Sequence, residues 1–357
     1  MKYKEFCADF GIRLPIIQAP MAGSDSVKLA IEVARAGGLG SLACALLTPD
    51  AIKNAVSEFR NNVPAPVNLN FFCHEMLPAD PKRNADWKQK LQPYYEQLGI
   101  NYNDATPTAL RMPFDNEMYK VLEQVKPEII SFHFGLPEPG LLERVKATGA
   151  KIISSATTVA EAHWLEARGC DAVIAQGAEA GGHRASFLHS DPRRQVGTIA
   201  LVPQVVDAVK IPVIAAGGIS DARGIAAAFM LGASAVQLGT AYLFCPEAKV
   251  STLYRNRLST VAADETVITN LFSGRPARGI LNRFVEEMGI ISADAPAFPY
   301  ASVYINPLRS KSEELQSNDF LQMWCGQGAE LCTAIAARKL TEELMTGALA
   351  LLGSKNE

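Results

Sequence analysis

Short apolar segments alternate along the chain with segments in which apolar residues recur every three or four positions. Eight segments of the first kind end in a small or polar residue, and they span residues 15–20, 39–44, 67–72, 129–135, 151–157, 172–177, 212–218 and 235–240. Near-continuous apolar strands that alternate with helices are typical of a parallel sheet buried on both faces. Eight such units predict an α/β fold of the closed (β/α)8 TIM-barrel type, whereas a doubly wound open sheet usually has fewer strands.

Helical patterns fill the intervals between these strands. Residues 26–36 are amphipathic and stop at Gly37 and Gly38, and glycine commonly ends a helix. Residues 158–169, 203–210 and 221–232 have the same character. We therefore expect helices at these places around the barrel.

Two segments are too long for the strand–helix repeat. One separates the third and fourth strands, and the other follows the eighth strand. We expect a barrel over residues 1–244 that carries an insertion at 73–128. A mostly helical region over 245–320 should cap the substrate site, and a C-terminal segment, 321–357, should return a helix (327–346) to the barrel.

Composition and charge exclude several classes of function. The 357 residues are 48% hydrophobic and carry a formal charge of −3, without a basic run that would suit a nucleic acid or an anionic membrane. The seven cysteines are scattered and form no CxxC pair, which argues against a disulfide framework and a metal site. The charged N-terminus does not resemble a signal peptide, and no stretch has the length of a membrane span. We expect a cytoplasmic protein.

Glycines gather at the carboxyl ends of the last three predicted strands. They are Gly177, Gly181, Gly182, Gly217, Gly218 and Gly239, and Thr240 follows the last of them. Glycine lets backbone N–H groups approach an anion, and a helix N-terminus favours negative charge. The loops after strands seven and eight of this fold often bind phosphate. A phosphate-bearing ligand is therefore predicted, and ordinary tight turns are the alternative.

Four amide side chains interrupt the apolar strands. They are Gln18, Asn70, Gln176 and Gln237. A buried amide without partners costs about 1–3 kcal/mol, so each needs hydrogen bonds. The heteroatom-rich edge of a ring such as isoalloxazine would supply them, and so would the backbone of neighbouring loops.

The fourth strand separates its residues into two faces. One face carries Ile129, Ser131, His133 and Gly135, and the other carries Ile130, Phe132 and Phe134. If the aromatic face packs against helices, His133 points into the mouth of the barrel. There an imidazole can act as a general base or donate a hydrogen bond to an anionic substrate, although a core histidine is the alternative. His183, on the glycine-rich loop after the sixth strand, is a second candidate for a phosphate or substrate contact.

Tyrosines cluster late in the sequence. Tyr300 and Tyr304 are spaced to share a helix face, and with Tyr254 they would line a pocket mouth. An aromatic packing stripe is the alternative. Arg275 and Arg278 lie in a loop that would have an anion-binding or structural role.

Six motifs occur at these strand ends in a fixed order. They are PIIQAPMAG (15–23), NFFCHE (70–75), SFHFGLP (131–137), AQGAEAGGHR (175–184), PVIAAGGISDARG (212–224) and AVQLGTAYLFCPEA (235–248). The chain, from about residue 10 to residue 340, resembles the nitronate monooxygenase family, formerly called 2-nitropropane dioxygenases. The segments NFFCH, SFHFG and FPYASVY resemble its class I branch.

The resemblance implies non-covalent binding of FMN and turnover without a nicotinamide. Its implied ring contacts are the backbone at Ala19, Pro20, Met21 and Ala22, with Asn70 (or Asn68), Gln176 and Gln237 at the polar edge. Its implied phosphate contacts are Gly181, Gly217, Gly218, Gly239 and Thr240, with Leu238 beside them. It makes His133 the active-site histidine and places Tyr254, Tyr300, Tyr304 and His183 in the substrate pocket.

The reaction implied is the oxidation of alkyl nitronates, such as propionate 3-nitronate, by O2 to carbonyl compounds and nitrite through a flavin semiquinone. An FMN-dependent NADH:quinone or enoyl-thioester reductase of the same superfamily is the nearest alternative. A flavin-free barrel that binds a sugar phosphate or nucleotide, and a non-catalytic binding module, are two others. The partners expected are a small nitronate and O2, in a homodimer or a monomer.

Overall fold

Eight parallel strands form a barrel. The computed structural model describes residues 2–101, 110–189 and 191–353, so parts of the predicted insertion and of the C-terminal segment (102–109 and 354–357) lie outside the described residues. The strands are β1 (Ile16–Gln18), β2 (Gly40–Ala43), β3 (Val67–Phe72), β4 (Ile129–His133), β5 (Lys151–Ala156), β6 (Ala172–Gln176), β8 (Val213–Ala216) and β9 (Ala235–Leu238). Their order is β1-β9-β8-β6-β5-β4-β3-β2. Hydrogen bonds between β1 and Leu39, at 2.9 Å each, close the ring and confirm the predicted barrel.

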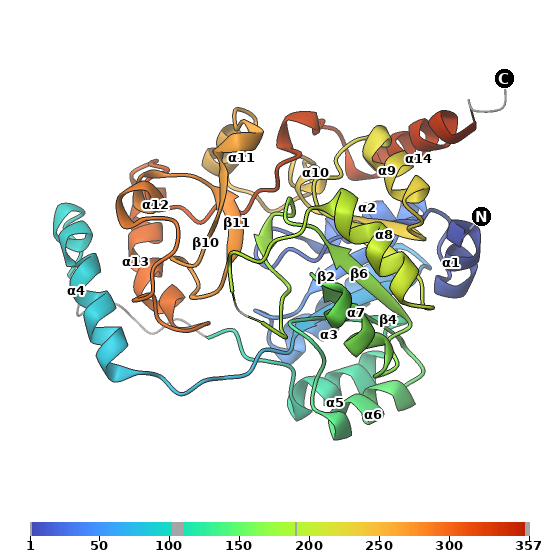
Figure 1. Cartoon of the computed structure of the whole chain (residues 1–357), viewed down its shortest axis with the longest axis horizontal. Helices are drawn as coiled ribbons and strands as arrows, with labels where there is room; N and C mark the ends of the chain where they lie inside the picture. Colours follow the sequence, from blue (N-terminus) through green and yellow to red (C-terminus); the bar gives the residue numbers. More distant parts are fainter. Residues whose placement is uncertain (1, 102–109, 190, 354–357) are drawn as a thin grey trace.

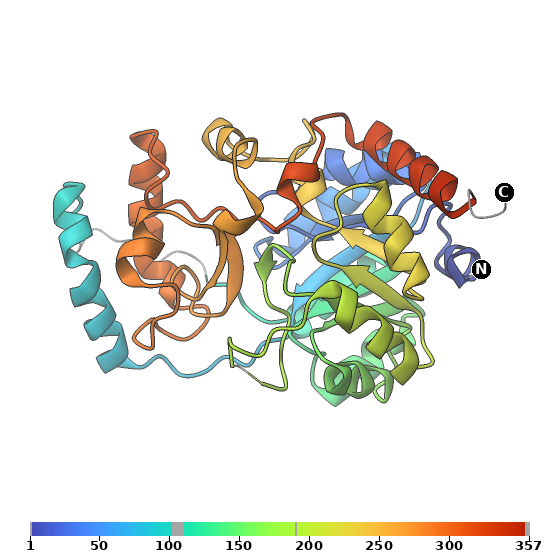
Figure 2. The same ribbon diagram turned by 45° about the horizontal axis from the view of Figure 1, so that its top comes forward.

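Helices surround the barrel (Figures 1 and 2). They are α2 (Val27–Ala36), α3 (Pro49–Asn62), α5 (Asn116–Val125), α6 (Pro139–Ala147), α7 (Val159–Glu166), α8 (Thr198–Ala208), α9 (Ala222–Met230) and α14 (Ala337–Gly353). The C-terminal helix α14 packs against both α9 and α2 and so closes the helical ring. It begins at Ala337, ten residues later than predicted. None of the helices in the described ranges combines the length and apolar character of a membrane span.

The start of α8 also differs from the prediction. The helix begins at Thr198 and not at residue 203, and Pro203 lies inside it. The carboxylate of Glu179 accepts a hydrogen bond from the Thr198 N–H at 2.9 Å, which satisfies a free donor of the first turn. A residue from a different loop therefore caps this helix, and the local sequence does not show it.

The N-terminal end of the barrel is filled by apolar side chains. Phe6 and Phe10 of α1 (Lys2–Phe10) pack in one cluster with interior strand residues such as Ile17, Ile129 and Ile153. This layer seals the barrel at that end. The ligand-accessible space therefore lies at the carboxyl ends of the strands.

A second layer covers the carboxyl ends of the strands (Figure 1, left of the barrel). It contains α4 (Pro81–Gln97), α10 (Thr240–Leu243), α11 (Thr252–Leu258), α12 (Arg283–Met288), α13 (Ala301–Glu314) and the short η2 (Ala263–Glu265) and η3 (Ala329–Leu331). It also contains a small antiparallel sheet of β10 (Thr266–Thr269), β11 (Ala277–Ile280) and β7 (Gly182–His183), which the sequence pattern did not reveal. Trp87 and Leu91 of α4 pack in one cluster with Ile305 and Leu308 of α13. The insertion after β3 thus supplies part of this layer.

Candidate active site

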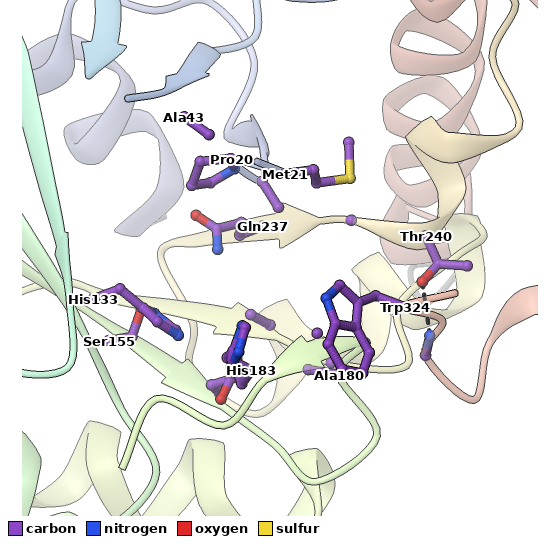
Figure 3. Close-up of a pocket in the computed structure, with 18 of the residues that line it drawn as sticks. Pro20, Met21, Ala43, His133, Ser155, Ala180, His183, Gln237, Thr240 and Trp324 are labelled. Carbon is purple, nitrogen blue, oxygen red and sulfur yellow. Dashed lines mark hydrogen bonds between the residues drawn. The ribbon is translucent and has the colours of Figure 1, made fainter. Parts of the chain in front are cut away.

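One cavity opens between the strand ends and the covering layer. Its empty volume is about 1300 Å³ including the opening to solvent. Most of the predicted site residues line it, namely Ala19, Pro20, Met21, Ala22, Asn70, His133, Gln176, Gly181, His183, Gly217, Gly218, Gln237, Gly239, Thr240 and Tyr254. Figure 3 shows His133 and Ser155 at one end of the cavity and Thr240 at the other, with Gln237 between them.

The end near Thr240 is built from closely spaced glycines. A Cβ atom on Gly217 would lie 2.8 Å from the Thr198 hydroxyl, and one on Gly181 would lie 2.6 Å from the Gly326 nitrogen. Gly217 and Gly218 also have positive φ angles, of 116° and 68°, which side chains other than glycine rarely adopt. Glycine therefore lets the backbone segments at this end pack closely without intervening side chains, as a backbone anion cradle requires.

A C-terminal segment completes this glycine end, and the sequence analysis did not anticipate it. Gly326 and Gly328 line the cavity beside the barrel loops, and the Gly326 N–H donates to the Thr240 hydroxyl at 2.9 Å. A Cβ atom on Gly328 would lie 2.5 Å from the Ser220 hydroxyl oxygen. The sequence Gly326-Gln327-Gly328 was the available signal, but it is far in sequence from the predicted strands.

Buried charges hold the loop after β6 in place. The guanidinium of Arg184 donates to the backbone carbonyls of Gly177 at 2.6 Å and Gln176 at 2.9 Å. The Thr198 hydroxyl oxygen lies 2.8 Å from a carboxylate oxygen of Glu179 and 2.9 Å from the Gly217 carbonyl oxygen, so its one hydrogen can be donated to either acceptor. The glycine turns after β6 and β8 are therefore tied to each other through side chains.

The buried amides differ in how much hydrogen-bonding capacity they leave free. Gln237 lines the middle of the cavity, and its Oε1 atom is buried without a partner among the described residues. In contrast, Gln176 donates to the His183 carbonyl at 3.0 Å and accepts from the Ala185 N–H at 2.9 Å. Gln18 likewise accepts from the Ser41 N–H and donates to a carbonyl. Gln237 is thus available to a ligand, while Gln176 and Gln18 serve the fold.

Asn70 and Asn68 occupy different environments. Asn70 lines the cavity and donates to the Ser131 hydroxyl at 2.9 Å. Asn68 is fully buried and donates to the Ser41 hydroxyl at 2.9 Å. Of the two residues that the sequence offered, Asn70 is therefore the one at the cavity wall.

His133 lies where the strand pattern predicted it, on the cavity face of β4. Its Nδ1 atom is 3.4 Å from the Ser155 hydroxyl oxygen. Burial, with the nearby positive charge of Arg275, lowers its pKa from 6.5 to about 3. The imidazole is therefore neutral at physiological pH and can donate one hydrogen bond and accept another.

His183 is held on β7, across the cavity from Pro20 and Met21 (Figure 3). Its Nε2 atom lies 2.9 Å from the Ser273 hydroxyl oxygen. Burial and the positive charge of Arg111 lower its pKa well below the usual value, so this imidazole is also neutral. One ring nitrogen of His183 is therefore paired with Ser273, as one ring nitrogen of His133 is with Ser155.

Phe134 departs from the predicted alternation. We expected it to pack against helices with Phe132, but β4 ends at His133 and Phe134 has a φ of 70°. Its ring lies instead with Phe72 and Phe298, and the guanidinium carbon of Arg275 is 3.9 Å from its centroid. The left-handed turn reverses the side chain, so Phe134 belongs to an aromatic cluster next to the cavity.

Three predicted residues do not lie on the cavity wall. Leu238 is buried and does not reach the cavity. Neither Tyr300 nor Tyr304 is among the described residues that line it. The Tyr300 hydroxyl donates to the Leu77 carbonyl at 3.0 Å, because the insertion passes next to α13. Tyr254 does line the cavity, but its hydroxyl is committed to the Trp324 carbonyl.

The cavity wall contains further residues that the sequence analysis did not single out. They include Ser155 on β5, Arg111 in the insertion, and Trp324 in the C-terminal segment. Arg111 and Trp324 lie in segments whose positions depend on tertiary packing, so local sequence patterns gave no signal for them. Ser155 lies on a predicted strand, where the alternation of side chains was the available signal.

Comparisons with known proteins agree with this arrangement. The family model described as nitronate monooxygenase matches residues 4–347. The nitronate monooxygenase of Pseudomonas aeruginosa is 38% identical over 341 residues, which cover 94% of this chain and 96% of that protein. That of Paraburkholderia phytofirmans is 39% identical over 341 residues, covering 94% of this chain and 92% of that protein.

Solved structures with the same fold include two related enzymes. The nitroalkane oxidase from Streptomyces ansochromogenes superposes with a TM-score of 0.88 at 33% identity, covering 96% of this chain and 98% of that chain. FabK from Thermotoga maritima superposes with a TM-score of 0.75 at 27% identity, covering 98% and 97%. The sequence and structural likenesses together show that this chain is an oxidoreductase that belongs to the nitronate monooxygenase family.

Proposed function

We propose that this protein is an FMN-dependent nitronate monooxygenase that oxidises alkyl nitronates, propionate 3-nitronate among them, with O2 to carbonyl compounds and nitrite. The observation that carries the proposal is a single cavity with a glycine-built end near Thr240 and a buried imidazole, His133, at the other end. The first end suits a phosphate, and the second suits a reacting anion.

The residues of the cavity fit FMN. A Cβ atom on Gly181, Gly217 or Gly326 would collide with neighbouring protein atoms, so glycine is what lets these backbone segments pack together at the proposed phosphate end. The unpaired Oε1 atom of Gln237 can accept a hydrogen bond from a ring N–H. Pro20 and Met21, with Ala43 beside them, form a wall of largely apolar atoms that suits a flat ring (Figure 3).

The flavin and the protein side chains have separate roles in the proposed reaction. When bound, the flavin supplies the one-electron redox chemistry that amino-acid side chains lack. His133 donates a hydrogen bond to a nitronate oxygen, or accepts the α-proton when a neutral nitroalkane binds. Phe72 and Trp324 contribute apolar surface to the cavity, which limits the water around the reacting carbon.

Oxygen consumption tests this function. Protein of measured flavin content should consume O2 and release nitrite when propionate 3-nitronate is added without NADH. A colourless preparation that FMN cannot reconstitute would contradict the proposed cofactor. Flavin-loaded protein that leaves the nitronate unchanged would contradict the proposed reaction.

The second function to test is the alternative given by the sequence analysis, an FMN-dependent NADH:quinone or enoyl-thioester reductase of the same superfamily. Such an enzyme would oxidise NADH under anaerobic conditions when given a quinone or an enoyl thioester. A nitronate monooxygenase would not need NADH. Measuring NADH oxidation without O2 on the same preparation separates the two.

A further inference from the structure

Among the described residues that line the cavity, Arg111 carries the only permanent charge. The other lining residues are apolar, neutral polar or histidine. Arg111 is half-buried, and within the described ranges its guanidinium makes no hydrogen bond or ion pair. A desolvated cation without a partner is costly, so the folded protein maintains an arrangement that an anion would stabilise.

The groups around Arg111 add to its positive potential. Arg309 of α13 repels it, and burial together with this repulsion lowers the pKa of Arg111 from 12.5 to about 10, so it stays charged at neutral pH. The Nε atom of Arg309 is itself buried, and no described residue is its hydrogen-bond partner. Burial lowers the pKa of His183 and of His74, that of His74 to about 4, and the positive charge of Arg111 lowers both further. The histidines are neutral, so they cannot supply the counter-charge for an anionic substrate.

We infer that Arg111 is the residue that selects the nitronate anion over the neutral nitroalkane. This inference rests on the proposed function and deepens it. The two substrate forms differ by one proton, and a neutral imidazole such as His133 can hydrogen-bond to either. A guanidinium distinguishes them, because charge-assisted hydrogen bonds to an oxyanion are about twice as strong as those between neutral groups. Arg111 therefore discriminates between the two substrate forms, while His133 forms a hydrogen bond to the substrate or accepts its α-proton.

Substitution of Arg111 tests the inference on the flavin-loaded enzyme. For Arg111→Met we expect the KM for an alkyl nitronate to rise about tenfold to hundredfold, the usual range for losing a hydrogen bond to a charged group. The KM for the neutral nitroalkane should change less than about threefold by the same reasoning. Arg111→Lys keeps the charge and should recover part of the nitronate affinity. Arg338→Met, on the exposed face of α14, is the matched control and should change neither constant.

A binding measurement gives a second readout that does not depend on turnover. Nitrate is a planar, unreactive oxyanion of the same shape as the nitronate head group. Calorimetric titration should show nitrate binding to the flavin-loaded wild type and to Arg338→Met, with affinity at least tenfold weaker in Arg111→Met. Equal affinity in wild type and Arg111→Met, or an equal rise of both KM values, would overturn the inference. So would loss of FMN in Arg111→Met, since Arg111 would then belong to the cofactor site.

The two proposals can fail separately. A wild-type enzyme that oxidises no nitronate contradicts the proposed function, and the nitrate titration still decides whether Arg111 binds an oxyanion. A wild type that oxidises nitronates normally, together with an Arg111→Met variant of unchanged selectivity, contradicts the inference alone.

Discussion

The Nδ1 atom of His133 lies 3.4 Å from the hydroxyl oxygen of Ser155, and the two residues belong to adjacent strands of the barrel. In one tautomer the Ser155 hydroxyl donates to Nδ1 and the hydrogen is on Nε2; in the other, Nδ1–H donates to Ser155 and Nε2 can accept a proton. Because burial lowers the pKa of His133 to about 3, the ring does not acquire a charge between pH 5 and 8. Its function at neutral pH is therefore that of a neutral hydrogen-bonding group and proton acceptor.

The first prediction separates these two roles of His133. The His133→Asn variant should retain FMN, because residue 133 lies at the end of the cavity away from the glycines. The kcat/KM for a neutral nitroalkane should fall about 100-fold or more, the scale for loss of a general base. The value for the corresponding nitronate should fall less than about tenfold, since only a neutral hydrogen bond is lost.

Steady-state oxygen uptake with both substrate forms measures this difference, and Ser155→Ala serves as a milder companion that keeps the imidazole. Equal losses on both forms would show that His133 does not act as a base. Wild-type rates in His133→Asn would remove the residue from the mechanism.

The second prediction concerns the two glutamines. Replacing Gln237 by Leu removes an acceptor that has no partner among the described residues, so the apoprotein should keep its stability or gain up to about 1 kcal/mol. FMN affinity should fall roughly fivefold to tenfold if the ring uses that acceptor. Gln176→Leu should instead destabilise the apoprotein by about 1–3 kcal/mol, because the Ala185 N–H and the His183 carbonyl lose their partner. Urea unfolding and FMN titration of both variants measure these changes, and an unchanged FMN affinity in Gln237→Leu would contradict the proposed role of Gln237.

The third prediction tests the glycine end. A Cβ atom on Gly239 would meet only the Ala19 Cβ at 3.6 Å, an ordinary contact, whereas one on Gly326 would lie 2.7 Å from the Glu179 carbonyl oxygen. Gly239→Ala should therefore leave the unfolding free energy within about 1 kcal/mol of wild type and weaken FMN binding. Gly326→Ala should reduce both the unfolding free energy and the FMN affinity. Gly353→Ala is the control, because a Cβ atom there would lie in open space, and it should reduce neither quantity. If Gly239→Ala binds FMN as tightly as wild type, the phosphate lies elsewhere.

The barrel could be predicted because its signal is local. Each strand is a run of buried side chains, and that requirement is visible in the residues themselves, as at Val67–Phe72. The position of His133 followed from strand alternation in the same way. The alternation failed one residue later, at Phe134, because a left-handed backbone turn reverses the direction of the side chain. Phenylalanine rarely adopts this conformation, so the sequence did not predict the turn.

Other parts of the site depend on contacts between distant segments. Arg111, Trp324 and Gly326 reach the cavity from the insertion and the C-terminal region, so no strand pattern points to them. The start of α8 is fixed by Glu179, which lies before it in another loop. Tyr300 was expected at the pocket, but its hydroxyl bonds to Leu77 of the insertion. Predicting these features needs the tertiary packing of the covering layer.

The last prediction concerns Asp25, which joins two parts of the cavity wall. One of its carboxylate oxygens accepts hydrogen bonds from the backbone N–H groups of Met21 at 3.2 Å and Ala43 at 2.9 Å, and both of these residues line the cavity. Burial raises the pKa of Asp25 from 3.8 to about 6 in spite of these bonds. The wall is thus held by a carboxylate whose charge is poorly solvated.

The sign of the pH effect follows from that shift. The folded protein binds the Asp25 proton more tightly than the unfolded chain, so the stabilisation is complete below about pH 4 and is lost as the pH rises through about 6. Asp25→Asn keeps an acceptor for both N–H groups and does not titrate. Relative to this variant, wild type should lose about 2–2.5 kcal/mol of unfolding free energy between pH 4 and pH 7. Asp25→Ala should instead be less stable than Asp25→Asn by at least about 2 kcal/mol at both pH values, because two N–H groups lose their acceptor. Urea unfolding of the three proteins at both pH values measures these differences, and parallel pH profiles for wild type and Asp25→Asn would show that the carboxylate is not the titrating group.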